Sequence, residues 1–225
     1  MAPHIAPVQT CEHFPSSAAV VVIGGGIVGL VAALTLSERG IPVVVLEKGV
    51  VAGEQSSRNQ GWVRKTSRAP ADVPLAIASD RLWAQLPQRL GEDVGYREAG
   101  ILFLAGSEAE MEPHDAWIRS VEPFGLDSRL LTPDDISRLV PGGQGKWAGG
   151  IYTPSDGRAE PSLAASAIAR AAIVKGAVIV ENCAVRSLVR SAGRVTGVVT
   201  ERGEINCDTV LLAGGLWSRR FLCNV

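Results

Sequence analysis

The sequence carries almost no net charge, because 22 lysines and arginines are balanced by 23 aspartates and glutamates. A balanced chain lacks the basic surface that binds nucleic acid or holds a protein electrostatically at a membrane. It also lacks a continuous apolar stretch of about 18 residues, the length that indicates a transmembrane helix. We therefore expect no nucleic-acid partner and no transmembrane segment.

Cysteine and histidine are scarce, with four and three copies. No two cysteines form a CxxC pair, and none lies at metal-ligand spacing from a histidine, so we expect no metal site. The cysteines are Cys11, Cys183, Cys207 and Cys223. We interpret them as reduced thiols, which predicts a cytoplasmic protein. A peripheral position at the inner membrane face is left open as an alternative.

Motifs of the common hydrolytic chemistries are absent as well. The sequence has no GxSxG elbow, no HExxH and no P-loop lysine, so it gives no support to a hydrolase, a zinc protease or an NTPase. We expect His4, His13 and His114 to be surface residues rather than catalysts. The sequence therefore assigns no catalytic residue.

Glycine, in contrast, is abundant, with 25 copies. The apolar run at residues 18–23 predicts a buried parallel strand, residues 30–39 predict a helix, and residues 42–46 predict a second buried strand. The length of this unit suits a right-handed βαβ crossover. A GxGxxG pattern lies between the first strand and the helix, formed by Gly24, Gly26 and Gly29.

This pattern predicts a dinucleotide site. Gly24 permits a tight turn, Gly26 lets a pyrophosphate approach the backbone, and Gly29 lets helix and strand pack closely. The helix N-terminus would offer N–H groups and a partial positive charge to the phosphates. Glu47, 18 residues after Gly29, would bind the ribose hydroxyls and disfavours NADP, but the pattern alone does not separate FAD from NAD. A glycine-rich turn without a nucleotide is the alternative.

A polar loop is predicted to follow the second strand over residues 51–71. Its segment Ser56–Trp62 reads SSRNQGW. Arg58 would meet pyrophosphate charge, and Gly61 with the small residues would let backbone amides approach a flat ring. A solvated polar loop is the alternative interpretation.

After residue 73 the sequence pattern alternates between short predicted helices and short predicted strands, which predicts an inserted α+β segment. A further helix and further strands follow it. Predicted helices cover residues 74–90, 108–121, 132–139 and 161–175. Predicted strands cover residues 100–104, 150–153, 178–180, 185–189, 195–200 and 208–213. Thr132 is the expected N-cap of its helix, and Gly40 and Gly176 are the expected stops of theirs.

Four stretches, in this order, resemble the FAD-dependent oxidoreductases of the D-amino-acid oxidase type. That family includes glycine and sarcosine oxidases, D-amino-acid dehydrogenases and opine oxidases. The first stretch is VVVIGGGIVGLVAALTLSERG with VVVLEK, and the second is SSRNQGWVR. The third is DGRAEPSLAASAIARAAIVKGAVIVEN, and the fourth is GRVTGVVTERGEINCDTVLLAGGLWS.

The resemblance implies an α/β fold: a Rossmann-like FAD-binding domain with a β-meander and an inserted α+β segment of the substrate domain. It divides the chain into a flexible leader at 1–17, a first part of the FAD-binding domain at 18–73, the insertion at 74–155 and a second part at 156–225. Family members are usually nearly twice this length. The chain therefore resembles their N-terminal half, with the substrate-binding residues expected beyond Val225.

The resemblance also implies that the cofactor is FAD and that the small-molecule substrate is an amine or amino acid. A hydride would pass from the substrate to the flavin, and the resulting imine would hydrolyse. The electron acceptor is left open between oxygen, a quinone and a partner subunit. Two alternatives remain: another flavin- or NAD-dependent oxidoreductase, and a truncated or partnered FAD-binding subunit without turnover of its own.

Further site residues follow from the same resemblance. It implies that the backbone of Val185 holds the adenine and that the turn of Ala213, Gly214 and Gly215 lies beside the flavin. Trp62 is the candidate for a substrate cage, whereas the other four tryptophans favour packing roles. The predicted cofactor-binding residues are Gly24, Gly26, Ile27, Val28, Gly29, Glu47, Lys48, Ser57, Arg58, Asn59, Gln60, Gly61, Val185, Ala213, Gly214, Gly215 and Trp217.

Overall fold

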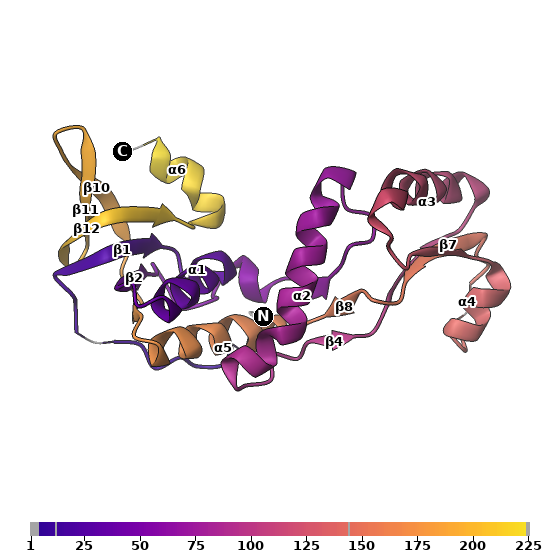
Figure 1. Cartoon of the computed structure of the whole chain (residues 1–225), viewed down its shortest axis with the longest axis horizontal. Helices are drawn as coiled ribbons and strands as arrows, with labels where there is room; N and C mark the ends of the chain where they lie inside the picture. The colour runs from indigo at the N-terminus through magenta and orange to yellow at the C-terminus, as the bar shows by residue number, and fades with distance from the viewer. Residues whose placement is uncertain (1–4, 12, 144, 224–225) are drawn as a thin grey trace. The chain divides into compact units, whose positions relative to one another are not determined.

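The structure is a computed structural model and describes residues 5–11, 13–143 and 145–223 (Figure 1). The chain forms two compact units. The first comprises the chain up to Asn59, the short stretch Glu92–Val94 and the chain from Glu160 onward. The second comprises Gln60–Gly91 and Gly95–Ala159. The second unit is therefore inserted into the first between Asn59 and Glu160, apart from the short stretch Glu92–Val94.

The first unit is built on one six-stranded sheet. Its strands are β1 (Ser17–Ile23), β2 (Val43–Leu46), β9 (Val178–Val180), β10 (Val185–Ser191), β11 (Arg194–Thr200) and β12 (Gly203–Leu212). Its helices are α1 (Ile27–Glu38), α5 (Pro161–Val174) and α6 (Ser218–Leu222), with 3₁₀ turns η1 (Gln55–Ser57) and η4 (Gly215–Trp217). The strand order is β10–β11–β12–β1–β2–β9. β12, β1, β2 and β9 are parallel, and β10, β11 and β12 form an antiparallel meander.

The central strands are apolar along their length because both faces of the sheet are covered. Val21 and Val22 are successive residues of β1 and point to opposite faces, yet both are fully buried. Helix α1 packs against α5. Gly40 and Gly176, with φ of 71° and 97°, follow these helices in the left-handed region, as predicted for their stops. The α/β fold with a meander predicted from the sequence is therefore confirmed.

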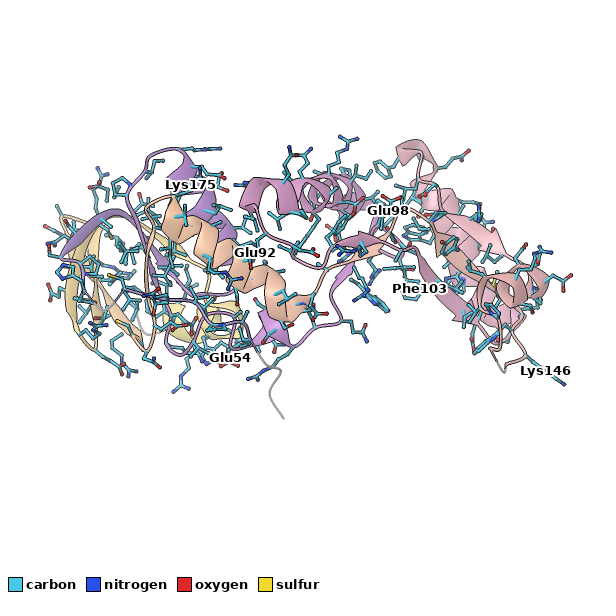
Figure 2. All side chains as sticks on the ribbon, turned by 90° about the horizontal axis from the view of Figure 1, so that it is seen from below. Glu54, Glu92, Glu98, Phe103, Lys146 and Lys175 are labelled. Atoms are coloured by element: carbon cyan, nitrogen blue, oxygen red, sulfur yellow. The ribbon has the colours of Figure 1, made fainter. Side chains whose placement is uncertain are left out.

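Several described residues of the predicted leader are hydrogen-bonded to the first unit. The Ala6 N–H donates to the Ser162 carbonyl of α5 over 3.3 Å, and the Cys11 N–H donates to the Ile179 carbonyl of β9 over 3.0 Å. Arg170 of α5 donates to the Pro7 carbonyl and pairs with Glu92, which Figure 2 labels. The predicted leader is held because β9 is an edge strand whose free backbone groups bind it.

The second unit contains two three-stranded antiparallel sheets. One has the order β3 (Trp62–Val63), β8 (Gly157–Arg158) and β4 (Arg97–Glu98). The other has the order β5 (Ile101–Ala105), β7 (Gly149–Thr153) and β6 (Arg129–Leu131). Its helices are α2 (Val73–Leu90), α3 (Glu108–Val121) and α4 (Pro133–Leu139), with 3₁₀ turns η2 (Pro70–Asp72) and η3 (Glu122–Phe124).

The boundaries of this unit differ from the division at residues 73/74 and 155/156 that the sequence suggested. The reason is the pairing of β3 with β8, which brings residues 60–73 into the second unit. Strands of two residues show no periodicity, so β3, β4 and β8 could not be predicted. The predicted helices agree to within three residues at each end, and Thr132 caps α4 in a reciprocal capping box with Asp135. β12 begins at Gly203, five residues before the predicted strand, and β6 was not predicted. Within the described residues, no helix combines the length and apolar composition needed to cross a membrane.

A buried ionic network joins the elements of the second unit. Lys65 follows β3, is 4% exposed, and places its Nζ 2.6 Å from Asp80 Oδ2 on α2 and 3.4 Å from Asp156 Oδ1 before β8. Asp156 is fully buried and also accepts the Thr66 N–H over 3.1 Å. The Tyr96 hydroxyl donates to Asp80, and burial together with this carboxylate raises the pKa of Tyr96. The network therefore links the residues after β3 to α2 and to the residue before β8.

Replacing Lys65 with methionine should destabilise the second unit strongly. The substitution leaves the buried carboxylate of Asp156 and the half-buried one of Asp80 without their cation, so we expect the free energy of unfolding to fall by about 3 kcal/mol. Urea unfolding followed by tryptophan fluorescence measures this change. The control is Arg119→Met, which removes an exposed pair with Asp115 and should cost less than about 1 kcal/mol. Equal small losses in both variants would contradict a structural role for the network.

Candidate functional site

The strand order of the first unit reverses at β1. β2 lies on one side of β1 and β12 on the other, and all three are parallel, so their carboxyl ends meet at one edge of the sheet. In open α/β sheets, ligands bind outside the carboxyl ends of the strands where the order reverses. The glycine turn Gly24–Gly26 lies there, between the end of β1 and the start of α1 (Figure 1).

The three glycines of the pattern have different surroundings. Gly24 has φ of 115°, and a Cβ there would lie 2.5 Å from the Ala213 carbonyl oxygen. A Cβ at Gly29 would lie 2.1 Å from the Gly24 carbonyl oxygen. At Gly26 the only neighbour within 4 Å is Ser56 Oγ at 3.1 Å. Two glycines are thus required by the protein's own packing, and Gly26 leaves space that a ligand can approach.

The N-terminus of α1 is suited to an anion. Its N-cap is Gly26, which offers no side-chain cap, and its first turn contains no acidic residue. The Ile27 N–H donates to Ser56 Oγ over 2.9 Å, and the Val28 side chain is 68% exposed. The helix dipole and the N–H groups of the first turn therefore act on this space without a competing carboxylate from the helix itself.

Glu47 braces the glycine turn. Its side chain is buried, Oε2 accepts the Gly25 N–H over 2.8 Å, and Oε1 accepts the Gly49 N–H over 2.8 Å. Each carboxylate oxygen has a second lone pair, so the same group can still accept from a ribose hydroxyl. The sequence predicted only the ribose role. The bracing role depends on backbone N–H groups that the sequence does not reveal.

Both cations among the predicted cofactor-binding residues pair with a carboxylate of the chain itself. Arg58 Nη1 lies 3.3 Å from Glu54 Oε2, and Arg58 Nη2 donates to the Gly53 carbonyl. Lys48 Nζ lies 2.7 Å from Glu54 Oε1 and 4.1 Å from the ring centroid of Trp217. The hydrogen bond from Lys48 and the two nearby cations lower the pKa of Glu54, which Figure 2 labels. In the structure the Arg58 guanidinium is therefore bound by Glu54 and by the Gly53 carbonyl.

Ser56, the neighbour of the predicted cofactor-binding residue Ser57, is the serine that contacts α1. Ser57 is buried and donates to the Glu54 carbonyl within η1. Asn59 Nδ2 donates to the carbonyls of Gln55 and Ser56 and closes the same turn. Because η1 is a single 3₁₀ turn, neighbouring side chains point in different directions, and the sequence alone could not choose between the two serines.

The predicted residues of the late chain lie near the end of β12 and at the start of β10. The Ala213 N–H donates to the Ile23 carbonyl over 2.9 Å, which holds the turn beside the end of β1. Gly214 precedes η4, Gly215 has φ of 53°, and Trp217 is 39% exposed. Val185 begins β10 and is half-buried opposite Thr200. The turn at Ala213 therefore adjoins the glycine turn.

Gln60 and Gly61 belong to the second unit. Gln60 is exposed, and Gly61 has φ of 72° and accepts the Ala159 N–H on its carbonyl. Trp62 follows, is 44% exposed, and packs edge-to-face against Phe103 with ring centroids 5.4 Å apart. The left-handed conformation explains the glycine at position 61 within the unit itself.

A groove of about 430 Å³ lies between β3 and α2 in the second unit. Its lining residues are Trp62, Val63, Arg64, Arg68, Asp72, Leu75, Ala76, Ser79 and Trp83. Two aromatic rings and two arginines therefore line a concave surface that contains one carboxylate. The arginines were not singled out from the sequence, where nothing distinguished them from other loop cations.

The two guanidinium groups of the groove act on one another. Burial lowers the pKa of Arg64, the positive charge of Arg68 lowers it further, and Asp156 opposes both. The Arg64 guanidinium also lies 5.7 Å from the ring centroid of Trp62 and 5.4 Å from that of Phe103. Two guanidinium groups beside aromatic rings make the groove suited to a carboxylate with an apolar or aromatic group.

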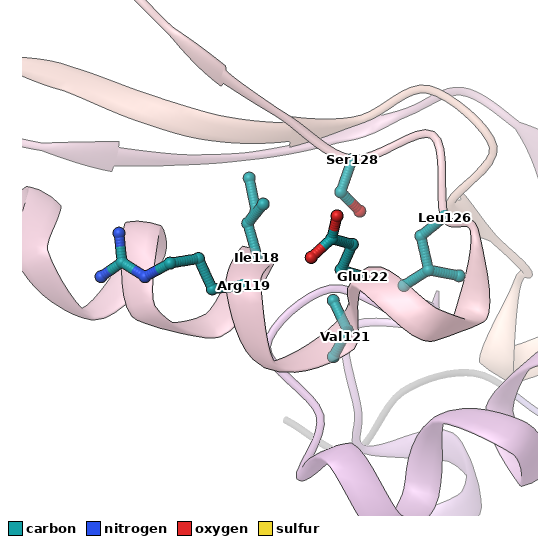
Figure 3. Close-up of a pocket in the computed structure, with 6 residues that line it drawn as sticks. All are labelled: Ile118, Arg119, Val121, Glu122, Leu126 and Ser128. Carbon is teal, nitrogen blue, oxygen red and sulfur yellow. The ribbon is translucent and has the colours of Figure 1, made fainter.

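A second concavity, of about 350 Å³, lies at the carboxyl end of α3 (Figure 3). Its lining residues are Ile118, Arg119, Val121, Glu122, Leu126 and Ser128. The Glu122 carboxylate and the Ser128 hydroxyl face one another, and Arg119 points away from them. Both charged side chains are exposed. We therefore assign no ligand to this concavity.

Titratable side chains were compared with metal sites over the part of the chain that the structure describes. Among the described residues, no group of three or more histidines, cysteines, aspartates or glutamates is arranged to hold a metal ion. The four cysteines are free thiols, two buried and two exposed. His13 is exposed, and burial lowers the pKa of the half-buried His114. His4 lies outside the described residues.

Comparison with known proteins identifies the family. The model of the FAD dependent oxidoreductase family matches residues 19–225. The chain therefore belongs to the FAD dependent oxidoreductase family, which confirms the resemblance found in the sequence.

Individual relatives agree with this assignment. Sarcosine oxidase subunit beta from Arthrobacter sp is 34% identical over 203 residues, covering 87% of this chain and 50% of that protein. The solved L-amino acid deaminase from Proteus myxofaciens superposes with a TM-score of 0.92 at 33% identity, covering 97% of this chain and 50% of that one. The pyruvate dehydrogenase phosphatase regulatory subunit from Mus musculus is 29% identical over 91% of this chain and 24% of that protein. The chain spans half or less of the length of these relatives.

Alanine substitutions at Gly29 and Gly26 should differ in their effect on stability, because only Gly29 is in close contact with the backbone. Gly29→Ala forces α1 away from the Gly24 carbonyl, so we expect the free energy of unfolding to fall by about 3 kcal/mol. Gly26→Ala meets only a serine hydroxyl and should cost less than about 1 kcal/mol. Denaturant unfolding followed by circular dichroism measures both values. Similar losses in the two variants would show that the close approach at Gly29 is not what the fold requires.

Proposed function

We propose that this chain binds FAD at the carboxyl end of β1 and serves in the oxidation of an amino acid or secondary amine. The observation that carries the cofactor assignment is the contrast within the glycine turn. Gly24 and Gly29 are closed by the protein's own backbone, whereas a Cβ at Gly26 would meet only the Ser56 hydroxyl, and Gly26 as the N-cap makes no side-chain hydrogen bond. A pyrophosphate needs such a close backbone approach at the start of a helix.

The remaining cofactor contacts follow from the same edge of the sheet. Glu47 would accept the ribose hydroxyls while its bonds to Gly25 and Gly49 keep the carboxylate oriented. The backbone of Val185 would hold the adenine, and the turn that begins at Ala213 would lie beside the flavin. The amides of α1 would meet the phosphates, and Lys48 and Arg58 would stay paired with the single carboxylate of Glu54.

When bound, FAD would accept a hydride from the substrate carbon, leaving an imine that water hydrolyses. The residues of this chain would bind and orient the reactants. Arg64 and Arg68 would hold the carboxylate of an amino-acid substrate, and Trp62 with Trp83 would pack on its side chain. The names of the relatives, a sarcosine oxidase subunit and an L-amino acid deaminase, support a substrate of this class.

A second candidate function is an FAD-binding subunit without turnover of its own. Two observations favour it: relatives are named as a subunit beta and as a regulatory subunit, and the chain spans only 50% and 24% of them. In this form the electrons would pass to a partner subunit or a quinone. Bound FAD without oxidation of any amine would distinguish this function from the enzyme.

The purified 225-residue chain should be yellow and should release FAD on denaturation. Gly26→Val should weaken FAD binding by at least about tenfold, because a side chain would fill the space open to the pyrophosphate. The visible spectrum identifies the flavin, and titration of flavin fluorescence gives the dissociation constant. The control is Gly106→Val in the second unit, where an added Cβ meets only Glu110 at 3.6 Å. Equal FAD affinity in both variants would refute the site.

The groove should bind an aromatic carboxylate. Benzoate should change the fluorescence of Trp62 and Trp83, and Arg64→Ala should weaken its binding by about tenfold. Arg64→Lys should restore only part of the affinity, because lysine lacks the planar fork of donors. The control is Arg81→Ala on α2, outside the groove lining. Unchanged benzoate affinity in Arg64→Ala would remove the groove from the proposed function.

A further inference from the structure

The loop after β2 is strained and buried. Val51 and Ala52 are each 2% exposed, and Ala52 has φ of 59°, in the left-handed region. A non-glycine residue keeps that conformation only where its surroundings hold it. One restraint is the Ala52 N–H, which donates to the Gly25 carbonyl over 2.9 Å. The conformation of this loop and that of the glycine turn are therefore linked.

The other restraint comes from the end of β9. Glu181 follows that strand, and its Oε1 accepts the Val51 N–H over 2.6 Å. The next two residues continue the contact, since the Asn182 N–H donates to the Gly49 carbonyl over 2.8 Å and the Cys183 N–H donates to the Glu47 carbonyl over 2.9 Å. The bond from Glu181 is the one made by a charged side chain, so it is the strongest of the three.

Glu181 is itself held by the N-terminal segment. Thr10 Oγ1 donates to Glu181 Oε2 over 3.4 Å, and the Cys11 N–H donates to the Ile179 carbonyl two residues before Glu181. The carboxylate therefore bridges the segment before β1 to the loop after β2. A path of hydrogen bonds runs from Thr10 through Glu181 and Val51–Ala52 to Gly25.

We propose that Glu181 is a positioning residue for cofactor binding, which acts on the glycine turn through Val51 and Ala52. The inference rests on the proposed binding of FAD at that turn. Removing the carboxylate leaves the buried Val51 N–H without its acceptor and frees Ala52 from its left-handed conformation. The Gly25 carbonyl then loses the hydrogen bond from Ala52. The glycine turn, whose N–H groups contact Glu47 and would contact the pyrophosphate, is no longer held in one conformation.

The test compares Glu181→Ala and Glu181→Gln in the full chain, with FAD itself as the probe. Fluorescence titration should show at least a tenfold loss of FAD affinity in Glu181→Ala. Glu181→Gln should lose about threefold, because a neutral amide oxygen still accepts from Val51 but more weakly. The control is Glu204→Ala, an exposed carboxylate on β12 that should bind FAD as the wild type does.

Hydrogen exchange of the FAD-free variants supplies a readout that loss of overall stability would not produce. Amides at residues 47–53 should exchange faster in both variants, whereas those of β11 should keep their wild-type protection. FAD affinity within twofold of wild type in the folded variants overturns the inference, and if Glu181→Ala does not fold, Glu181→Gln decides alone. A wild-type chain that binds no FAD overturns the proposed function together with this inference. Wild-type binding with unaffected variants overturns the inference alone.

Discussion

The site depends on one close contact, the approach of α1 to the end of β1 that Gly29 permits. With a side chain at this position, a Cβ would stand 2.1 Å from the Gly24 carbonyl oxygen, so the helix could not begin where it does. Its position decides that Gly26 becomes the N-cap and that Gly25 turns its N–H toward Glu47 and its carbonyl toward Ala52. The glycine turn, the carboxylate and the strained loop are therefore parts of one arrangement.

The charges around this arrangement are used in two ways. Glu47 is buried and oriented by backbone N–H groups, so its second lone pairs keep a defined direction. Glu54 is half-buried, and its single carboxylate pairs with both Lys48 and Arg58. A phosphate at the turn would consequently meet backbone dipoles, together with two cations that already share a carboxylate. The backbone dipoles favour a ligand recognised by shape and hydrogen bonds.

The fold and the glycine turn could be predicted because their signals are local. An apolar strand, three glycines and a closing carboxylate each follow from adjacent residues, as do the helix stop at Gly40 and the cap at Thr132. Two contacts could not be predicted: the hydrogen bond of the Ile27 N–H to Ser56 rather than Ser57, and the ion pair of Arg58 with Glu54. They depend on how η1 turns and on which carboxylate lies nearby. The hydrogen bond from Cys11 to β9 could not be predicted either, because it depends on β9 being the edge strand of the sheet.

The two candidate functions share the first unit and differ in what the second unit must do. A subunit that only carries FAD needs the glycine turn, Glu47 and the turn at Ala213, all of which lie in the first unit. It has no need for a concave surface on which the guanidinium groups of Arg64 and Arg68 lie beside the rings of Trp62 and Trp83. Guanidinium donors suit a carboxylate, and aromatic rings suit an apolar side chain. The groove is therefore the feature of the chain that favours the proposed amino-acid-oxidising enzyme over a cofactor-carrying subunit.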